Sequence, residues 1–428
     1  MGAFGPLDGV RILEFTQIIA GPLGCMLLAD QGAEVMKVEP LTGEPWRVYQ
    51  MFMPLESKTY QSLNRGKQSI ALDLTTPEAQ AIVHRLVRDV DVVVSNYRPD
   101  VPGRLGIDYE TLRAIKPDLI YVDSTAFGRK GPWAMKPGYD IVAQGVSGFT
   151  AAGGRFDENG NPVLPGGTAT ADFATGYAIA WGTCAALYHK AMTGEGQLVE
   201  TSLLVNALNF LGGSFMSLPP ADVLVRTAFL EDLKAARERG EGYAQIVQRR
   251  QARLAVAQLG NIYYRNYLTK DGAIAIGNLS LSLRQKMRDV LGIEYDRRDH
   301  DPAYNPRDPE TIEAGNALTA RVEKMIAADT SAYWVEKFEA AGVPVGELNF
   351  TEELDQHPQI IENGYVIALD HDLSGPQTMV SPPHKMSVTP PTARTASPPL
   401  GRDTDAILAS AGYTADEIVA FRAKGAIG

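Results

Sequence analysis

The first half of the chain alternates short apolar runs with amphipathic stretches. Residues 10–15 (VRILEF), 33–39 (AEVMKVE) and 91–95 (DVVVS) are apolar runs of strand length. Such runs are typical of strands that are buried on both faces of a parallel sheet. Between them the string TTPE at 75–78 combines a capping residue, a proline and an early acid, which is a signature of a helix start. Further strands are expected at 69–74, 119–124 and 198–204, and helices at 23–31, 77–87, 109–115 and 139–148. The alternation predicts a doubly wound, mostly parallel α/β sheet.

A long apolar segment follows at residues 173–192. It has no proline and almost no charge before Lys190, and this pattern predicts a helix that is buried on most of its surface. Asp172 stands where this helix should begin. A carboxylate there would be stabilised by unpaired backbone N–H groups and by the positive end of the helix dipole. From position alone Asp172 is an N-cap, and a catalytic role needs support from other motifs.

The second half of the chain predicts a smaller, separate domain. After Pro220 the composition changes, and residues 221–258 are rich in Arg, Glu, Gln and Ala, which indicates an exposed helical segment. Residues 261–277 read as a hairpin that turns at Lys270-Asp271-Gly272. Helices are expected at 282–291, 309–327, 331–341, 403–411 and 415–423, and strands at 343–348 and 366–369. We therefore expect a large domain with its N-terminal part at 1–221, a small inserted domain at 222–330, and a segment at 331–428 that returns to the large domain.

Composition and charge exclude several classes of protein. The 428 residues are 45% hydrophobic, and the formal net charge of −11 argues against a general nucleic-acid or anionic-membrane surface. The two cysteines, Cys25 and Cys184, lie in apolar runs, so a disulfide scaffold and a cysteine metal site are not expected. No uncharged run is long enough to span a bilayer, and no signal peptide is apparent. We expect a cytoplasmic protein.

The common signatures of catalysis are missing. The six histidines form no metal pair, and neither a G-x-S-x-G elbow nor a P-loop occurs. The turn TQIIAGPLG lacks the G-x-G-x-x-G spacing of a nicotinamide dinucleotide site. What remains is the carboxylate of Asp172 together with basic residues near the ends of predicted strands, which could together form an anion site: Lys37, Arg47, Lys67, Arg98, Arg104 and Lys136.

Several ordered strings then identify a family. They are LDGVRILEF, AGPLG, GAEVMKVE, LNRGKQSIALDL, VVVSNYRP, RLGIDYETL, KPDLIYVDSTAFG, GYDIVAQGVSG, TGEGQLVETSLL and PPLGRDTDAIL. The chain closely resembles the class III CoA-transferases, which include formyl-CoA transferase and carnitine CoA-transferase. The resemblance is dense over residues 6–215, faint over 219–330, and returns at 342–427.

The resemblance implies a reaction and a set of site residues. CoA would move from an acyl-CoA thioester to a carboxylic acid acceptor through an aspartyl-CoA thioester on Asp172, which matches the family's aspartate in the string TADFATG. No metal or redox cofactor is implied, and coenzyme A takes part as a portion of the substrate. The positions that match the family's CoA contacts are Lys37, Lys67, Asn96, Tyr97, Arg104, Lys136 and Tyr139. The first of these, a basic position after the second strand, is met approximately by either Lys37 or Arg47.

The resemblance also implies an architecture. It is a Rossmann-like, doubly wound large domain built from both ends of the chain, with a smaller inserted α+β domain. Two copies would form an interlocked homodimer.

Two other functions stay open. The α-methylacyl-CoA racemases resemble the same span, but they pair the aspartate with a histidine in a G-H-D string, where this chain has Gly138-Tyr139-Asp140. A tyrosine, with an ordinary pKa of about 10, is a poor proton shuttle. A non-catalytic CoA-binding protein on the same fold is the third hypothesis.

The size of the acceptor acid is a further expectation. The glycine-rich loop that covers the active site in formyl-CoA transferase has no counterpart between 219 and 280. The missing loop and three aromatic residues that are candidates for the acceptor pocket, Trp46, Tyr60 and Phe149, favour an acceptor acid larger or less polar than oxalate.

Overall fold

The protein consists of two compact units, described here from a computed structural model for residues 5–255 and 261–428. The first unit is Met1–Met216 together with Pro358–Gly428, and the second is Ser217–His357. The second unit is therefore wider on both sides than the expected insert at 222–330, and the chain returns to the first unit at Pro358.

The first unit is built on a six-stranded parallel sheet with the order β5-β2-β1-β6-β7-β8. The strands are β1 (Arg11–Phe15), β2 (Glu34–Glu39), β5 (Lys67–Ala71), β6 (Val92–Ser95), β7 (Ile120–Thr125) and β8 (Leu198–Ser202). Counted along the chain this order is 3-2-1-4-5-6, the order of a Rossmann-like doubly wound sheet. The chain changes direction across the sheet between β1 and β6, so a crevice is expected at the carboxyl ends of these two strands.

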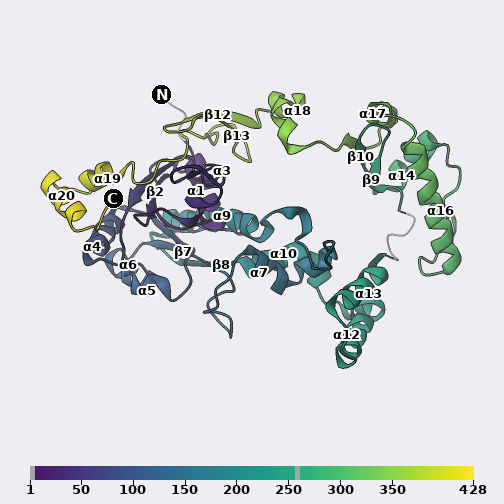
Figure 1. Ribbon diagram of the computed structural model, residues 1–428, viewed down its shortest axis with the longest axis horizontal. Coiled ribbons are helices and arrows are strands. Elements are labelled where there is room, and N and C mark those ends of the chain that lie inside the picture. Colours follow the sequence, from purple (N-terminus) through teal and green to yellow (C-terminus); the bar gives the residue numbers. More distant parts are fainter. Residues whose placement is uncertain (1–4, 256–260) are drawn as a thin grey trace. The chain divides into compact units, whose positions relative to one another are not determined.

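Two helical layers cover this sheet (Figure 1). On one face, Ile12, Val92 and Val122 pack against α1 (Ala20–Asp30) and α9 (Thr170–Thr193). On the other face, Leu13 and Val93 pack against four helices, α4 (Pro77–Leu86), α6 (Tyr109–Ile115), α19 (Thr404–Ser410) and α20 (Ala415–Ala423). The continuous apolar runs of the strands serve both cores because successive side chains point to opposite faces.

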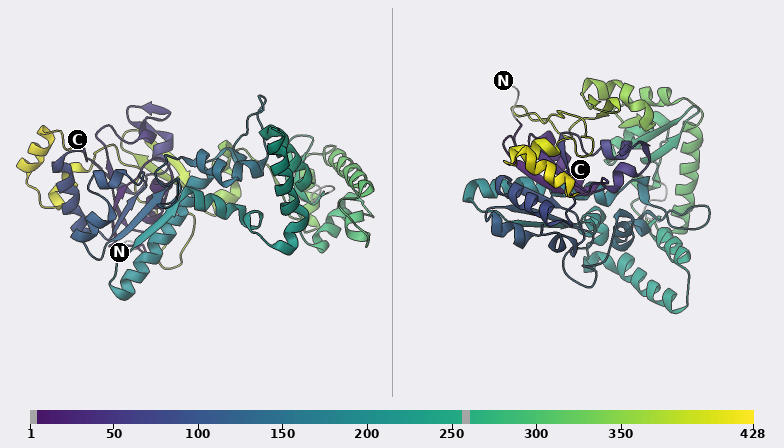
Figure 2. Two further views of the ribbon diagram at one scale, coloured as in Figure 1. Left: turned by 90° about the horizontal axis from the view of Figure 1, so that it is seen from below. Right: turned by 60° about the vertical axis from the view of Figure 1, so that its left-hand side comes forward.

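The C-terminal segment packs on β5, at the edge of the sheet. Ile427 forms a bridge with Leu72, and the Ser69 N–H donates to Asp403 Oδ2 at 2.8 Å. In Figures 1 and 2 the yellow C-terminal helices lie beside the blue helices of the N-terminal half. The large unit is thus made from both ends of the chain.

The remaining elements of the first unit surround the sheet. They are α2 (Pro45–Val48), β3 (Met51–Met53), β4 (Glu56–Ser57), α3 (Lys58–Gln61), α5 (Val101–Arg104), α7 (Asp140–Ser147), α8 (Phe149–Gly153), α10 (Leu203–Phe215), α18 (Pro358–Glu362), β12 (Val366–His371) and β13 (Gly375–Val380). Neither α10 nor β13 was expected from the sequence. Helix α10 directly follows β8 and is itself apolar, so its start looks like a continuation of the strand, and β13 contains Gly375, Pro376 and Gln377, which are unusual in strands.

The second unit has one core under a small antiparallel sheet of order β11-β10-β9. Its strands are β9 (Tyr264–Leu268), β10 (Ala273–Gly277) and β11 (Val345–Glu347), and the predicted hairpin joins the first two. Its helices are α11 (Pro219–Asp222), α12 (Ala228–Glu238), α13 (Tyr243–Ala255), α14 (Leu281–Leu291), α15 (Arg297–His300), α16 (Pro309–Ile326) and α17 (Ser331–Ala340). The expected charged helical segment is α12 and α13, and its last predicted residues, 256–258, lie outside the described residues.

The long helix α9 carries an exposed aromatic face, so the prediction that it is buried on most of its surface is wrong for a single chain. The exposed residues recur at helical spacing at Phe173, Tyr177, Trp181, Tyr188 and Met192, and Trp181 is 78% exposed. The missing charge in the sequence signals an apolar surface, but it does not say which molecule covers that surface. No helix among the described residues is long and apolar enough to cross a membrane.

Two glycines allow α1 and α9 to approach closely. A Cβ atom on Gly24 would lie 2.6 Å from Ile179, and one on Gly176 would lie 2.7 Å from Leu23. The contacts rise together along both helices, so α1 and α9 run side by side in the same direction and begin at the same edge of the sheet.

We expect Gly176→Ala to destabilise the protein although alanine favours helices. The new methyl group overlaps Leu23, and overpacking of this kind costs about 1–3 kcal/mol, more than the gain of about 1 kcal/mol from helix propensity. The midpoint of urea unfolding should therefore fall. The matched control is Gly145→Ala in α7, where no described atom lies within 4 Å of the new Cβ and the midpoint should stay or rise. A rise for Gly176→Ala would contradict the close packing.

Candidate active site

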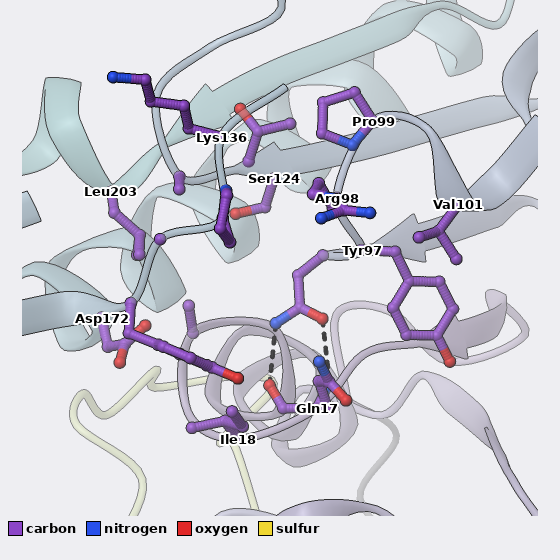
Figure 3. A pocket seen from close by; sticks show the side chains of 17 residues that line it. Gln17, Ile18, Tyr97, Arg98, Pro99, Val101, Ser124, Lys136, Asp172 and Leu203 are labelled. Atoms are coloured by element: carbon purple, nitrogen blue, oxygen red, sulfur yellow. Dashed lines mark hydrogen bonds between the residues drawn. The ribbon is translucent and has the colours of Figure 1, made fainter. Parts of the chain in front are cut away.

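A cavity of about 430 Å³ lies at the carboxyl ends of β1 and β6, where the strand order reverses. Six chain segments reach it: the loop after β1, the loop after β6, the end of β7, the stretch before α7, the start of α9 and the start of α10. Figure 3 shows Asp172 on one side of the cavity, Arg98 and Tyr97 on the other, and Gln17 and Ile18 below. The cavity therefore occupies the crevice that a doubly wound sheet reserves for ligands.

Asp172 lines this cavity and is the third residue of α9, which begins at Thr170. The N-cap position belongs to Ala169, so the interpretation of Asp172 as a capping residue is wrong. The Asp172 N–H instead donates to Asp140 Oδ1 at 3.0 Å. A carboxylate from α7 thus caps the helix, and this leaves the side chain of Asp172 available to the cavity.

The environment of Asp172 favours the neutral carboxylic acid. Burial, followed by the negative charge of Asp140, raises the pKa of Asp172 from 3.8 to about 7. Burial and the like charge of Asp140 thus act against the ionised form that the N–H groups and dipole of the helix start would favour. At neutral pH the carboxylate and the acid are both populated.

Asp140 was not predicted as a site residue. Its carboxylate also accepts a hydrogen bond of 2.5 Å from Gln144 Nε2, one turn further along α7. Gln144 is fully buried, and its Nε2 lies 3.3 Å from the carbonyl oxygen of Thr168. Asp140 is part of the string Gly138-Tyr139-Asp140, which the sequence comparison with the racemases had singled out. Only the tertiary structure shows that it contacts Asp172.

Four of the predicted CoA contacts line the cavity with Asp172, namely Asn96, Tyr97, Lys136 and Tyr139. The Asn96 amide is already engaged, since Oδ1 accepts from the Gln17 N–H at 3.0 Å and Nδ2 donates to the Gln17 carbonyl at 2.9 Å (Figure 3). Burial raises the pKa of Tyr97 to about 12, so its phenol stays neutral. Lys136 Nζ lies 4.3 Å from the centre of the Trp133 ring.

Arg98 lines the cavity, whereas the predicted Arg104 does not. Arg98 pairs with Asp100 at 2.5 Å. The side chain of Arg104 is 68% exposed and lies 3.4 Å from the same carboxylate. Both arginines follow β6, and the short helix α5 turns the second one away.

Lys37 and Lys67 do not line this cavity. Both are fully buried, and their ammonium groups lie 3.2 and 2.9 Å from the carboxylate of Glu14. Burial pushes the pKa of Glu14 upward, but the two lysines outweigh it and hold that pKa below its ordinary value. Both lysines were expected to contact CoA, but in the structure both form ion pairs with the carboxylate of Glu14.

The three candidates for the acid pocket also lie elsewhere. Trp46 stacks on Tyr49 with ring centres 4.7 Å apart, and Phe149 packs against Phe210. Tyr60 is fully buried beneath the Arg47 guanidinium, 3.7 Å from its ring centre. None of the three lines the cavity, so they do not inform the size of the acceptor. Over residues 5–255 and 261–428 there is no group of three side chains that could hold a metal ion.

Comparisons with known proteins agree with this geometry. Succinyl-CoA:glutarate CoA-transferase of Homo sapiens is 31% identical over 417 residues, which cover 95% of this chain and 86% of that protein. Acetyl-CoA:oxalate CoA-transferase of Acetobacter aceti is 32% identical and covers 90% of each chain. The crystal structure of a mutant of Rv3272 from Mycobacterium tuberculosis superposes with a TM-score of 0.75 at 26% identity, covering 95% of this chain and all of that one.

The family model matches almost the whole chain. It is described as CoA-transferase family III and matches residues 7–404, which include every part of the cavity. The central parallel sheet and the cavity at its switch point are compatible with that match. The chain belongs to CoA-transferase family III and is a class III CoA-transferase.

Proposed function

We propose that Asp172 is the nucleophile that carries CoA between two carboxylic acids as an aspartyl-CoA thioester. One observation carries this proposal: Asp172 is the buried carboxylate of the cavity, and with a pKa of about 7 its ionised, nucleophilic form is still populated at neutral pH. A partly desolvated carboxylate is also a stronger nucleophile than a hydrated one.

The proposed reaction has two symmetrical halves. A carboxylate oxygen of Asp172 attacks the thioester carbonyl of the donor, the C–S bond breaks, and a mixed anhydride and CoA thiolate form. The thiolate then attacks the Asp172 carbonyl carbon, the C–O bond breaks, and the donor acid leaves as a carboxylate. The acceptor carboxylate attacks the aspartyl-CoA, and the released thiolate recaptures the acceptor's acyl group. Asp172 is regenerated, and no net proton is gained or lost.

The walls of the cavity support binding of CoA. Arg98 and Lys136 supply positive charge near its rim, suited to the phosphates of CoA, and Tyr97 and Tyr139 add aromatic surface. Arg98 takes the place that the sequence assigned to Arg104. Glutarate and oxalate appear in the names of the relatives, so dicarboxylates are the first acceptors to test.

The covalent mechanism predicts a CoA adduct on the peptide that holds Asp172. Purified protein is incubated with acetyl-CoA, succinyl-CoA or formyl-CoA without acceptor, and its peptides are analysed by mass spectrometry. We expect one donor to give the adduct, and hydroxylamine to convert it to a hydroxamate at Asp172. Asp172→Asn should abolish both the adduct and transfer, whereas Glu195→Gln, which changes an exposed acid beyond α9, should keep them.

Two outcomes would contradict the covalent mechanism: transfer of CoA by Asp172→Asn, or transfer by the wild type without any adduct. Exchange of the α-proton in D2O without transfer would favour the racemase.

The raised pKa of Asp172 predicts the pH dependence of adduct formation. Only the ionised form attacks, so the single-turnover rate should rise with pH through about 7, by about tenfold between pH 6 and pH 8. Asp140→Asn removes the like charge and keeps an oxygen that can accept the Asp172 N–H. Its profile should move to lower pH, although not fully, because burial is the larger cause. An unchanged profile would show that Asp140 does not influence the nucleophile.

We further propose that a second copy of the chain covers the aromatic face of α9. This face contains Phe173, Tyr177, Trp181, Tyr188 and Met192, and exposed apolar area of this kind marks an interaction surface. A homodimer is the assembly that the family resemblance implies.

The dimer predicts a mass in solution of twice the 46.3 kDa chain. Trp181→Glu should shift the protein toward the monomer in light scattering, because a charge would be buried against an apolar partner. Val419→Glu on α20, at a similarly exposed apolar position, should leave the mass unchanged. A monomeric wild type would contradict the proposal.

A further inference from the structure

A strained backbone conformation forms part of the cavity wall at Ile18. Its φ is +72°, in the left-handed region that β-branched residues rarely adopt. The other non-glycine residues with positive φ among the described residues are Gln50 and Leu55, and neither lines this cavity. A conformation of this kind persists only where the surroundings hold it.

Glu44 holds this conformation directly. Its Oε2 accepts the Ile18 N–H at 2.7 Å, and its side chain is 2% exposed. The other carboxylate oxygen, Oε1, lies 3.1 Å from Lys37 Nζ. The hydrogen bond is therefore charge-assisted, and its acceptor is itself oriented by a buried cation.

The residues before Ile18 are held in the same way. Lys37 Nζ donates to the Thr16 carbonyl at 2.9 Å. The Asn96 amide binds both the N–H and the carbonyl of Gln17. Side chains from β2, from the loop after β2 and from the loop after β6 thus fix three consecutive residues, of which Gln17 and Ile18 line the cavity with Asp172.

This arrangement gives the buried charges a role in the site. Lys37 cannot reach the cavity, since it is fully buried and lies between Glu14, Glu44 and the Thr16 carbonyl. Through Glu44 it acts on the wall of the cavity that Asp172 also lines. Loss of Glu44 would leave the Ile18 N–H without its partner and Lys37 with one carboxylate fewer, so the strained turn would relax.

We propose that Glu44 is a positioning residue, which with Lys37 holds Ile18 in its left-handed conformation and so fixes the part of the cavity wall formed by Gln17 and Ile18. This inference rests on the proposed function, because an effect of Glu44 on the rate assumes that Asp172 reacts in this cavity. Glu44 would act on the placement of the thioester and not on the cationic rim, so its loss should alter kcat more than the KM for the CoA donor.

The test uses glycine to remove the need for the clamp. Glycine adopts φ near +70° without strain, whereas valine is β-branched like isoleucine. Glu44→Ala is made in the wild type, in Ile18→Gly and in Ile18→Val, and each pair is compared within its own background. We expect Glu44→Ala to lower kcat on the order of 10- to 100-fold with Ile or Val at position 18. With glycine there the loss should be under about threefold, because the turn then needs no clamp.

Two further measurements keep the inference testable. Glu44→Gln retains an oxygen for the Ile18 N–H, so it should keep more activity than Glu44→Ala, and it replaces that variant if Glu44→Ala does not fold. The shift in urea midpoint caused by Glu44→Ala should also be smaller in Ile18→Gly than in Ile18→Val, and this readout does not depend on catalysis.

The outcomes separate the two proposals. If the wild type forms no CoA adduct with any donor while the urea midpoints still couple positions 18 and 44, the proposed function fails and the clamp stands. If the wild type transfers CoA but Glu44→Ala costs the same in the glycine and valine backgrounds, in both rate and midpoint, the clamp is overturned.

Discussion

The close packing of α1 on α9 is the constraint on which the site depends. Gly24 and Gly176 remove the side chains that would hold these helices apart, and the two helices begin at the same edge of the sheet. The loop that leads into α1 carries Gln17 and Ile18, and the first turn of α9 carries Asp172. Larger side chains at these two glycines would hold the helices farther apart, and with them the loop and the carboxylate.

Two buried carboxylates, Glu14 and Asp172, have opposite electrostatic environments. Glu14 is surrounded by the ammonium groups of Lys37 and Lys67, so its charge is compensated and its pKa is low. Asp172 has no such cation among the described residues, and burial, followed by the charge of its neighbour Asp140, raises its pKa. Both groups cost desolvation energy, but only the first recovers it through ion pairs. An uncompensated carboxylate in a cavity is a poor structural element and a suitable nucleophile.

The ion pairs around Glu14 extend to the turn between β1 and α1, which lines the cavity together with Asp172. Lys37 is shared by Glu14 and Glu44, and Glu44 binds the Ile18 N–H. The compensated charges lie behind the cavity wall, where they can hold a strained backbone without contacting a ligand. The uncompensated carboxylate of Asp172 lies in the cavity lining itself.

The sequence by itself determined the alternation of strands and helices in the central sheet and the family of the protein. It also singled out Asp172 as the residue before the long apolar segment. Strands β1, β2 and β6 and helix α6 follow from local periodicity, because burial on one or both faces leaves a direct mark on neighbouring residues. Local pattern could not tell the lysines apart. Lys37, which has a buried carboxylate partner, and Lys136, which faces the cavity, look alike in the sequence.

Only the tertiary structure decided the chemistry around Asp172 and the surface of α9. Burial and the charge of Asp140, 32 residues away, raise the pKa of Asp172, and the Ile18 N–H donates to Glu44, 26 residues away. Arg98 and Arg104 differ because one short helix rotates the second out of the cavity. The physical reason is the same in each case: the sign and strength of an electrostatic interaction depend on distance and desolvation, and both are set by segments that are remote along the chain.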